Sequence, residues 1–208
     1  MSRRGALAAG GLVLALAWGL VAAGFGMTGH MTAHMAVTAL AAPLIAWGLA
    51  GSRADPATRW PWLAPLPVSL VEFAAVWGWH APAARRLAEG SLAGAALEQA
   101  SFLAAGLLLW SAALGTRGAG AAARRAAGVG ALLLTSMHMT LLGALIGLAP
   151  RALYGGEGLI CGDWRLSPLA DQQLGAALML TIGAGAYLLG GLVMLAELLR
   201  APAGEARA

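Results

Sequence analysis

Long apolar runs separated by short polar stretches dominate this chain. Six runs approach or exceed the ~20 residues that a helix needs to cross a ~30 Å hydrocarbon layer. The third run is short and bracketed by prolines, and the sixth is long enough to project beyond a bilayer. A bilayer offers no water to satisfy open backbone, so each run should be a helix. The pattern predicts an all-α integral membrane bundle of about six transmembrane helices, forming one domain over residues 1–208. The expected spans are residues 6–25, 28–50, 66–81, 91–114, 126–149 and 169–199.

Composition supports this class. Hydrophobic residues make up 60% of the chain and charged residues 11%, and the mean hydropathy is +0.75. A soluble domain has roughly 45–50% apolar and about 25% charged residues. The shortfall in charge is too large for a surface that faces water on all sides, so membrane lipid is an expected partner.

Charge placement predicts the orientation. All thirteen basic residues are arginine, and they are spread over loops and termini rather than gathered in a stripe, so no nucleic-acid partner is expected. With an internal N-terminus, nine arginines fall on the inside and four outside, which favours both termini in the cytoplasm. The internal set is Arg3, Arg4, Arg53, Arg59, Arg117, Arg124, Arg125, Arg200 and Arg207, and the external set is Arg85, Arg86, Arg151 and Arg165.

The first run and the cysteine content add two points. The chain starts with two arginines, as a secretory signal does, but the apolar run that follows exceeds the typical 7–15 residues, so we expect it to be retained as a helix. Cys161 is the only cysteine, which excludes an internal disulfide and any CxxC motif.

Residues 26–35 read GMTGHMTAHM and open the second predicted span. At ~100° per residue, all five histidine and methionine side chains share an arc of about 140° on one helical face. Thioethers suit Cu(I), and imidazole suits copper and zinc alike. A mixed face without cysteine therefore favours copper. The alternative is that the methionines are flexible core fillers and the histidines are hydrogen-bonded interfacial residues. The face consists of Met27, His30, Met31, His34 and Met35.

Four further polar residues are predicted to lie in the outer half of the bundle or near its midplane. Polar side chains inside a bilayer are costly, so each is a functional candidate. Each also has a structural alternative: His80 in an aromatic belt beside two tryptophans, Glu98 and Asp171 as helix bridges or caps, and His138 as a hydrogen-bonded core histidine. The candidate ligands added to the first face are His80, Glu98, His138 and Asp171.

Three other polar residues within the predicted spans are not expected to bind metal. Gln172 and Gln173 are expected to connect helices rather than bind metal. Glu72 lies in the inner half of the third span without an evident partner, and no role is assigned to it.

Several of these stretches, in order, resemble the multi-span CtaG family, which assists assembly of bacterial cytochrome c oxidase. They are HMTAHMAVTALAAPLIAWG, WHAP, LEQASFLAAGLLLW, LLGALIGLAPRALY and LSPLADQQLGAALM, within residues 27–190. The chain departs from the family's usual pattern at Gln99, where a histidine is common, and at Leu180, where a tryptophan is common. If the family's glutamate–histidine pair binds metal, only Glu98 of that pair is present here, which favours His30 and His34.

The resemblance implies an assembly factor in the bacterial plasma membrane with cytochrome c oxidase subunits as partners. It also implies transient binding of copper, as Cu(I), on the outer side, received from a periplasmic donor. Three alternatives stay open: a b-type haem or quinone oxidoreductase, a copper permease, and a scaffold that binds no metal. The sequence has no nucleophile–base pair and no phosphate loop, so we do not expect an enzyme.

Overall fold

The computed structural model describes residues 1–115, 121–156 and 158–200, and most of this part of the chain is helical. Arg117 and Arg207, which count toward the predicted orientation, lie outside the described residues, as does the end of the predicted domain. The prediction of an all-α membrane protein is confirmed by the long apolar helices that follow.

Five helices in the described ranges are long and apolar enough to cross a membrane. Two of them are continuous helices with a π-helical segment in the middle. In order they are α1 (Arg3–Ala23); α2 (Gly26–Met35) with η1 (Ala36–Ala41) and α3 (Ala42–Leu49); α7 (Leu92–Leu114); α8 (Ala121–Gly147); and α9 (Pro168–Leu178) with η2 (Met179–Ala184) and α10 (Gly185–Arg200).

The third predicted span is the helix α5 (Pro65–His80), which packs against α7 and α8 but has only 16 residues. That is fewer than the ~20 residues of a full crossing, so the predicted number of six spans is not confirmed. Prolines set both of its ends. Pro65 occupies the first turn, where a missing N–H costs nothing, and Pro82 forces Ala81 into an extended conformation. His80 is therefore the last residue of α5, at the bend into α6 (Pro82–Glu89).

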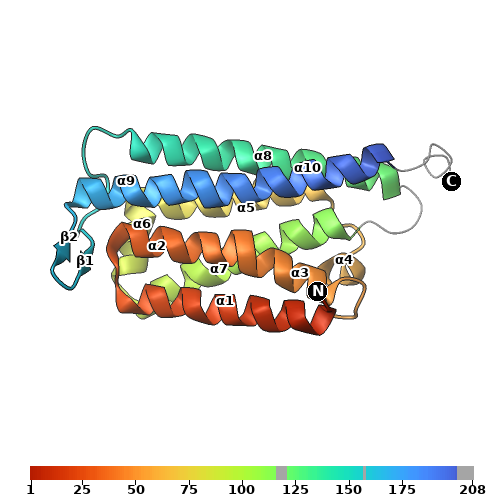
Figure 1. The fold of residues 1–208 in the computed structure, drawn as a ribbon, viewed down its shortest axis with the longest axis horizontal. Helices are drawn as coiled ribbons and strands as arrows, with labels where there is room; N and C mark the ends of the chain where they lie inside the picture. Colours follow the sequence, from red (N-terminus) through yellow and green to blue (C-terminus); the bar gives the residue numbers. More distant parts are fainter. Residues whose placement is uncertain (116–120, 157, 201–208) are drawn as a thin grey trace.

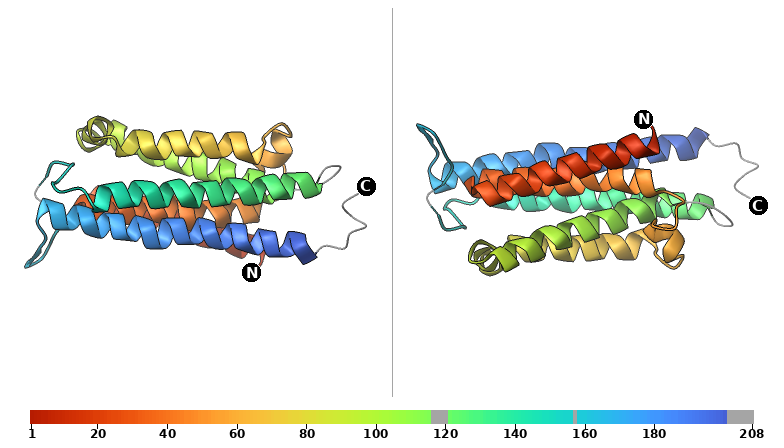
Figure 2. Two further views of the ribbon diagram at one scale, coloured as in Figure 1. Left: turned by 90° about the horizontal axis from the view of Figure 1, so that it is seen from above. Right: turned by 90° about the horizontal axis from the view of Figure 1, so that it is seen from below.

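The long helices lie side by side along the longest axis of the molecule (Figures 1 and 2). One end carries the α1–α2 turn, α6 and an antiparallel hairpin of β1 (Ile160–Cys161) and β2 (Trp164–Arg165). We call it the hairpin end. The start of α1, the short helix α4 (Pro56–Arg59) and the end of α10 lie at the opposite end. Which end faces the cytoplasm stays a prediction.

The two π-helical segments create polar contacts inside the bundle. A π turn leaves backbone carbonyls without their usual helical partners, and side chains of other helices donate to them here. The carbonyl of Thr38 in η1 accepts from Trp110 Nε1 at 3.1 Å and from the Tyr187 hydroxyl at 3.3 Å. The carbonyl of Ala184 in η2 accepts from Ser136 Oγ at 2.8 Å. Both segments are thereby tied to neighbouring helices.

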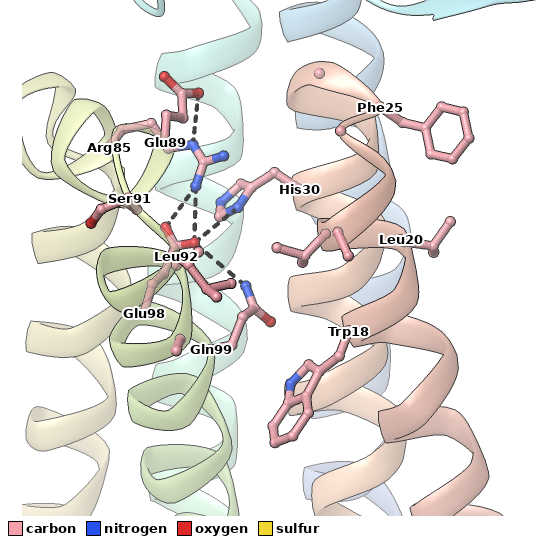
Figure 3. A pocket seen from close by; sticks show the side chains of 17 residues that line it. Trp18, Leu20, Phe25, His30, Arg85, Glu89, Ser91, Leu92, Glu98 and Gln99 are labelled. Atoms are coloured by element: carbon pink, nitrogen blue, oxygen red, sulfur yellow. Dashed lines mark hydrogen bonds and ion pairs between the residues drawn. The ribbon is translucent and has the colours of Figure 1, made fainter.

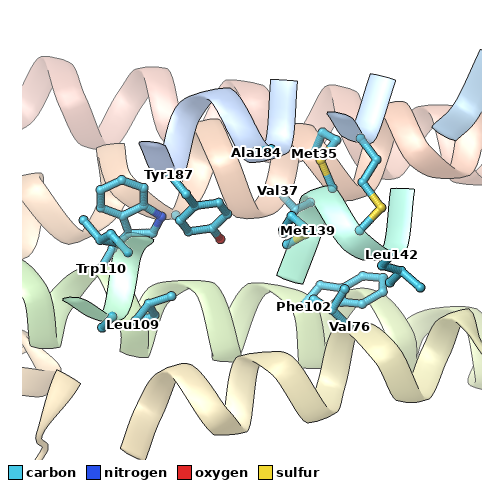
Figure 4. Packing of buried hydrophobic residues seen from close by; sticks show 14 of the residues in the cluster. Met35, Val37, Val76, Phe102, Leu109, Trp110, Met139, Leu142, Ala184 and Tyr187 are labelled. Atoms are coloured by element: carbon cyan, nitrogen blue, oxygen red, sulfur yellow. The ribbon is translucent and has the colours of Figure 1, made fainter. Parts of the chain in front are cut away.

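An apolar core of buried side chains from several helices packs around these contacts (Figure 4). Met35 and Met139 are fully buried in it, together with Phe102 of α7. Met35 lies against Gly183 of η2, where a Cβ atom would collide with the methionine sulfur. The glycine thus permits the close approach of the second and last long helices. By contrast, α1 is largely exposed, as expected of a helix that faces lipid.

Candidate metal site

The predicted His/Met face begins at a helix end that Asp171 fixes in place. Its carboxylate accepts hydrogen bonds from the backbone N–H groups of Met27 at 2.8 Å and Thr28 at 2.9 Å. Gly26 has φ +58, and a Cβ there would collide with the same carboxylate, so only glycine allows this approach. A carboxylate at a helix N-terminus satisfies free N–H groups and the helix dipole. Asp171 therefore has the capping role that the sequence left open.

Three imidazoles meet about one turn further along. The ring centroids of His30 and His34 are 5.4 Å and 5.3 Å from that of His80, and 6.2 Å from each other. Three imidazoles that bind one ion at about 2.0 Å would place their ring centroids about 5–6 Å apart. All three side chains are at least 96% buried, since their exposed fractions are 3%, 0% and 4%. The two spacings to His80 fall in the range for a shared ion, whereas the 6.2 Å between His30 and His34 exceeds it.

A thioether completes this group. His80 Nδ1 lies 2.7 Å from the carbonyl oxygen of Val76, and its Nε2 lies 3.4 Å from Met31 Sδ. The carbonyl can only accept, so Nδ1 carries the hydrogen, and a neutral ring then directs the Nε2 lone pair at the sulfur. A histidine that donates one N–H to a backbone carbonyl and offers the other nitrogen is typical of metal ligands. Nitrogen and sulfur at about 2.0 and 2.3 Å from a tetrahedral ion would be separated by about 3.5 Å.

The other two imidazoles make no hydrogen bonds with any described residue, although His30 Nδ1 lies 3.5 Å from a carboxylate oxygen of Glu98. All four ring nitrogens of His30 and His34 are buried and lack a hydrogen-bond partner among the residues that the structure describes. Buried polar atoms are normally paired, so this exception requires an explanation. In their present rotamers, no group of three or more His, Cys, Asp or Glu side chains in the described ranges is arranged to hold a metal ion. The rings of His30 and His34 are nearly parallel, and both would have to rotate toward His80 and Met31 to share one.

Glu98 is adjacent to this cluster but is already paired. Its Oε2 lies 3.5 Å from His30 Nδ1, while Arg85 Nη1 donates to both of its oxygens at 2.9 Å. Gln99 Nε2 also lies 3.4 Å from Oε2, and Arg85 Nε lies 3.2 Å from Glu89 Oε1. Figure 3 shows Arg85 between the two carboxylates, with His30 beside them. Glu98 is thus held beside the imidazoles rather than among them.

A cavity of about 590 Å³ leads to this point (Figure 3). It lies at the hairpin end between the α1–α2 turn and the α6–α7 connection, and most of its wall is apolar. Its polar wall consists of His30, Arg85, Glu89, Ser91, Glu98 and Gln99. His30 belongs to both the cavity and the imidazole cluster, so a small ion in the cavity would reach the cluster through it.

The remaining predicted ligands lie elsewhere. His138 Nε2 is 2.9 Å from Glu72 Oε2, and the Phe73 ring stands edge-on to the imidazole with its centroid 5.1 Å away. Met35 packs in the apolar core, and the backbone of Met27 lies against Gly175 of α9. The structure therefore gathers His30, His34, His80 and Met31 and places Glu98 next to them. Asp171, His138 and Met35 instead make the contacts described above.

Sequence reasoning missed three supporting residues. Glu72 received no role because the histidine that pairs with it is 66 residues away in the chain. Arg85 was counted only toward orientation, although the interval of 13 residues to Glu98 spans one helical hairpin. Tyr154 donates from its hydroxyl to the carbonyl of His80 at 2.9 Å. Burial raises the pKa of Tyr154 to about 12, so the hydroxyl keeps its proton at neutral pH.

The predicted connecting role of Gln172 agrees with its contacts. Its Nε2 donates to the Ile146 carbonyl at 2.9 Å, and its Oε1 accepts from the Leu153 backbone at 2.7 Å. It thereby links α9 to the end of α8 and the loop that carries Tyr154. Gln173, next to it, is exposed.

Comparison with known proteins adds one finding. No curated protein and no solved structure matches the chain. A family model described as cytochrome c oxidase caa3 assembly factor (Caa3_CtaG) matches residues 1–201, which is nearly the whole sequence. The chain therefore belongs to the family of cytochrome c oxidase caa3 assembly factors.

Proposed function

We propose that this protein serves cytochrome c oxidase assembly by holding Cu(I) in transit at the hairpin end of the bundle. The ion would be bound by Met31 and His80, with His30 and His34 rotating to complete its coordination. Copper is cargo in this scheme: a periplasmic donor supplies it, and an oxidase subunit receives it. The protein would act in the bacterial plasma membrane with the hairpin end outside.

The observation that carries this proposal is the contact between His80 Nε2 and Met31 Sδ. Two electron-pair donors face one another at 3.4 Å in a buried site, while the opposite ring nitrogen is anchored on the Val76 carbonyl. Imidazole and thioether together suit a soft ion such as Cu(I) better than a hard divalent ion. His30 and His34 alongside have ring nitrogens without hydrogen-bond partners among the described residues, and they would supply further nitrogen ligands.

The contacts of His138 reduce support for the haem alternative. Haem ligation in this bundle would need two histidines facing one another across it, and His34 and His138 are a candidate pair because they lie on different helices. His138 Nε2 is engaged by Glu72, which leaves only its Nδ1 for such a role. The permease alternative requires a polar route through both halves. The structure shows a cavity of about 590 Å³ at the hairpin end and another of about 200 Å³ at the opposite end, lined in part by Arg3 and Glu197, and the two share no lining residue.

The test is an anaerobic Cu(I) titration of the detergent-purified chain against a chromogenic chelator. Met31→Leu keeps the side-chain volume and removes the sulfur, so we expect copper affinity to fall at least tenfold. Met35→Leu is the matched control, because its sulfur packs against Gly183 one turn away. Equal affinities in the two variants would contradict the assignment. X-ray absorption of the copper-loaded chain should show a copper–sulfur distance that only Met31→Leu removes.

A second measurement addresses the imidazoles. His30→Ala combined with His34→Ala should lower the copper bound per purified protein while leaving membrane insertion intact. Oxidase activity in a strain that lacks the chain should recover with the wild type and not with this double variant. Unchanged copper content in the double variant would remove both histidines from the site.

A further inference from the structure

A carboxylate within reach of a metal site is normally expected to be a ligand, and Glu98 is within reach. Its Oε2 lies 3.5 Å from His30 Nδ1, and its side chain is 1% exposed. Both of its oxygens nevertheless accept hydrogen bonds from Arg85 Nη1 at 2.9 Å. A guanidinium is always charged and cannot give up its positive charge to admit a metal ion. Arg85 therefore occupies the carboxylate that an ion at His30 would otherwise use.

The charges around the cluster follow from this pairing. Met31 and the three imidazoles, when neutral, contribute no net charge, and Arg85 carries the charge opposite to that of Glu98. Glu89, the second partner of Arg85, is 41% exposed, so water screens its charge more than that of the buried Glu98. The cost of burying an ion rises steeply with its charge unless opposite charge accompanies it. A buried site without a free carboxylate thus accepts a monovalent ion more readily than a divalent one. Zn²⁺ and Cu²⁺ would therefore bind less favourably here than at a site in which the Glu98 carboxylate is free.

Arg85 also stands on the approach to the site. It lines the same cavity as His30, and its Nε contacts Glu89, a side chain 41% exposed. Glu89 and Glu98 line the same cavity, so its charged wall does not exclude divalent ions. Selection between charge classes therefore depends on the ligand set at the cluster, where Arg85 pairs with Glu98.

We infer that Arg85 is a specificity-determining residue, which holds Glu98 out of the coordination shell and so makes the site selective for soft monovalent ions over divalent ions. This inference rests on the proposed function, since it concerns the same site. It adds the charge class of the cargo and the residue that sets it.

The experiment compares Ag⁺, a redox-stable monovalent soft ion, with Zn²⁺ on the full detergent-purified chain. Arg85→Gln should free Glu98 and raise Zn²⁺ affinity at least tenfold, with a change of less than threefold for Ag⁺. Arg86→Gln is the matched control, because Arg86 is the next residue on α6 and its side chain is exposed. Combining Arg85→Gln with Glu98→Gln should abolish the gain in Zn²⁺ affinity, since that gain requires the carboxylate.

The outcomes separate the two proposals. If the wild type binds no Ag⁺, the proposed function itself fails. If it binds Ag⁺ and Arg85→Gln leaves the ratio of Zn²⁺ to Ag⁺ affinity within twofold of wild type, only the role of Arg85 is overturned.

A measurement on the wild type covers the case in which Arg85→Gln does not fold. Infrared difference spectra identify the Glu98 carboxylate bands by their loss in Glu98→Gln. Ag⁺ should leave these bands in place in the wild type. A shift of the kind produced by direct coordination would show that Glu98 is a ligand despite Arg85 and would overturn the inference.

Discussion

In this bundle, metal-site candidates differ from structural residues in whether their buried polar atoms have hydrogen-bond partners. Asp171, Glu98 and His138 each have a hydrogen-bonded partner, although His138 Nδ1 has none among the described residues. His30 and His34 lack a hydrogen bond at both ring nitrogens among the described residues, and an unsatisfied buried polar group costs about 1–3 kcal/mol. Such a cost at two adjacent turns of one helix favours a ligand that compensates it. The hydrogen-bond partners of individual atoms thus distinguish candidate ligands from structural residues better than residue type does.

The Glu72–His138 pair should behave as a structural pair. Removing one member leaves the other buried and unpaired, so Glu72→Leu and His138→Leu should each destabilise the protein by about 3 kcal/mol. The double variant should lose at least 1 kcal/mol less than the sum, because no orphaned group remains. Unfolding in detergent measures all three.

Met137→Leu provides the control for this cycle, since its side chain is 63% exposed on the same helix and should leave stability unchanged. If the double variant loses as much stability as the two single variants together, Glu72 and His138 are not coupled.

At the scale of elements, the start of α2 depends on its cap. Asp171→Ala should lower the free energy of unfolding by about 1–2 kcal/mol, because two backbone N–H groups lose their acceptor. Asp171→Asn should retain only part of that stability, because its amide keeps one acceptor oxygen and turns an NH2 donor toward the second backbone N–H. Thermal unfolding and copper titration of both variants check this. A tenfold loss of copper affinity in a stable Asp171→Asn protein would instead make Asp171 a ligand.

Helices were predictable here because a bilayer-sized apolar run leaves the backbone no alternative. The π-helical segments were not, because AVTALA and MLTIGA read as ordinary helix and their departure depends on donors such as Trp110 from other helices. The β1–β2 hairpin was also missed, since two-residue strands leave no periodicity to detect. Local sequence therefore predicts the presence of an element better than its internal geometry.

The site residues that lie on one helix could be predicted from the sequence, but those contributed by other helices could not. Spacing of four residues places His30 and His34 on one face without further information. Which of His80, His138 and Glu98 join them depends on how each helix is rotated about its axis, and apolar runs do not encode that rotation. The structure resolves it by turning His80 toward Met31 and His138 toward Glu72.

Across the whole molecule, the candidate metal-binding residues lie toward one end of the bundle. The imidazole cluster, the Arg85–Glu98 pair and the cavity all lie toward the hairpin end, and Tyr154 links the loop after α8 to the same place. An ion delivered from one side of the membrane would meet all of them without crossing it. The side on which that end lies consequently decides whether the proposed exchange with a periplasmic donor is feasible.

Cys161 allows that side to be determined directly. It is exposed at the hairpin, and it is the only cysteine in the chain, so no background thiol competes with it. The predicted N-in/C-in orientation requires that a membrane-impermeant maleimide label Cys161 in intact spheroplasts. Cys161→Ala combined with Ala54→Cys moves the thiol to an exposed position beside α4, at the opposite end, and should be labelled only after permeabilisation. The reverse pattern would place the cluster on the cytoplasmic side, where a periplasmic copper donor could not reach it.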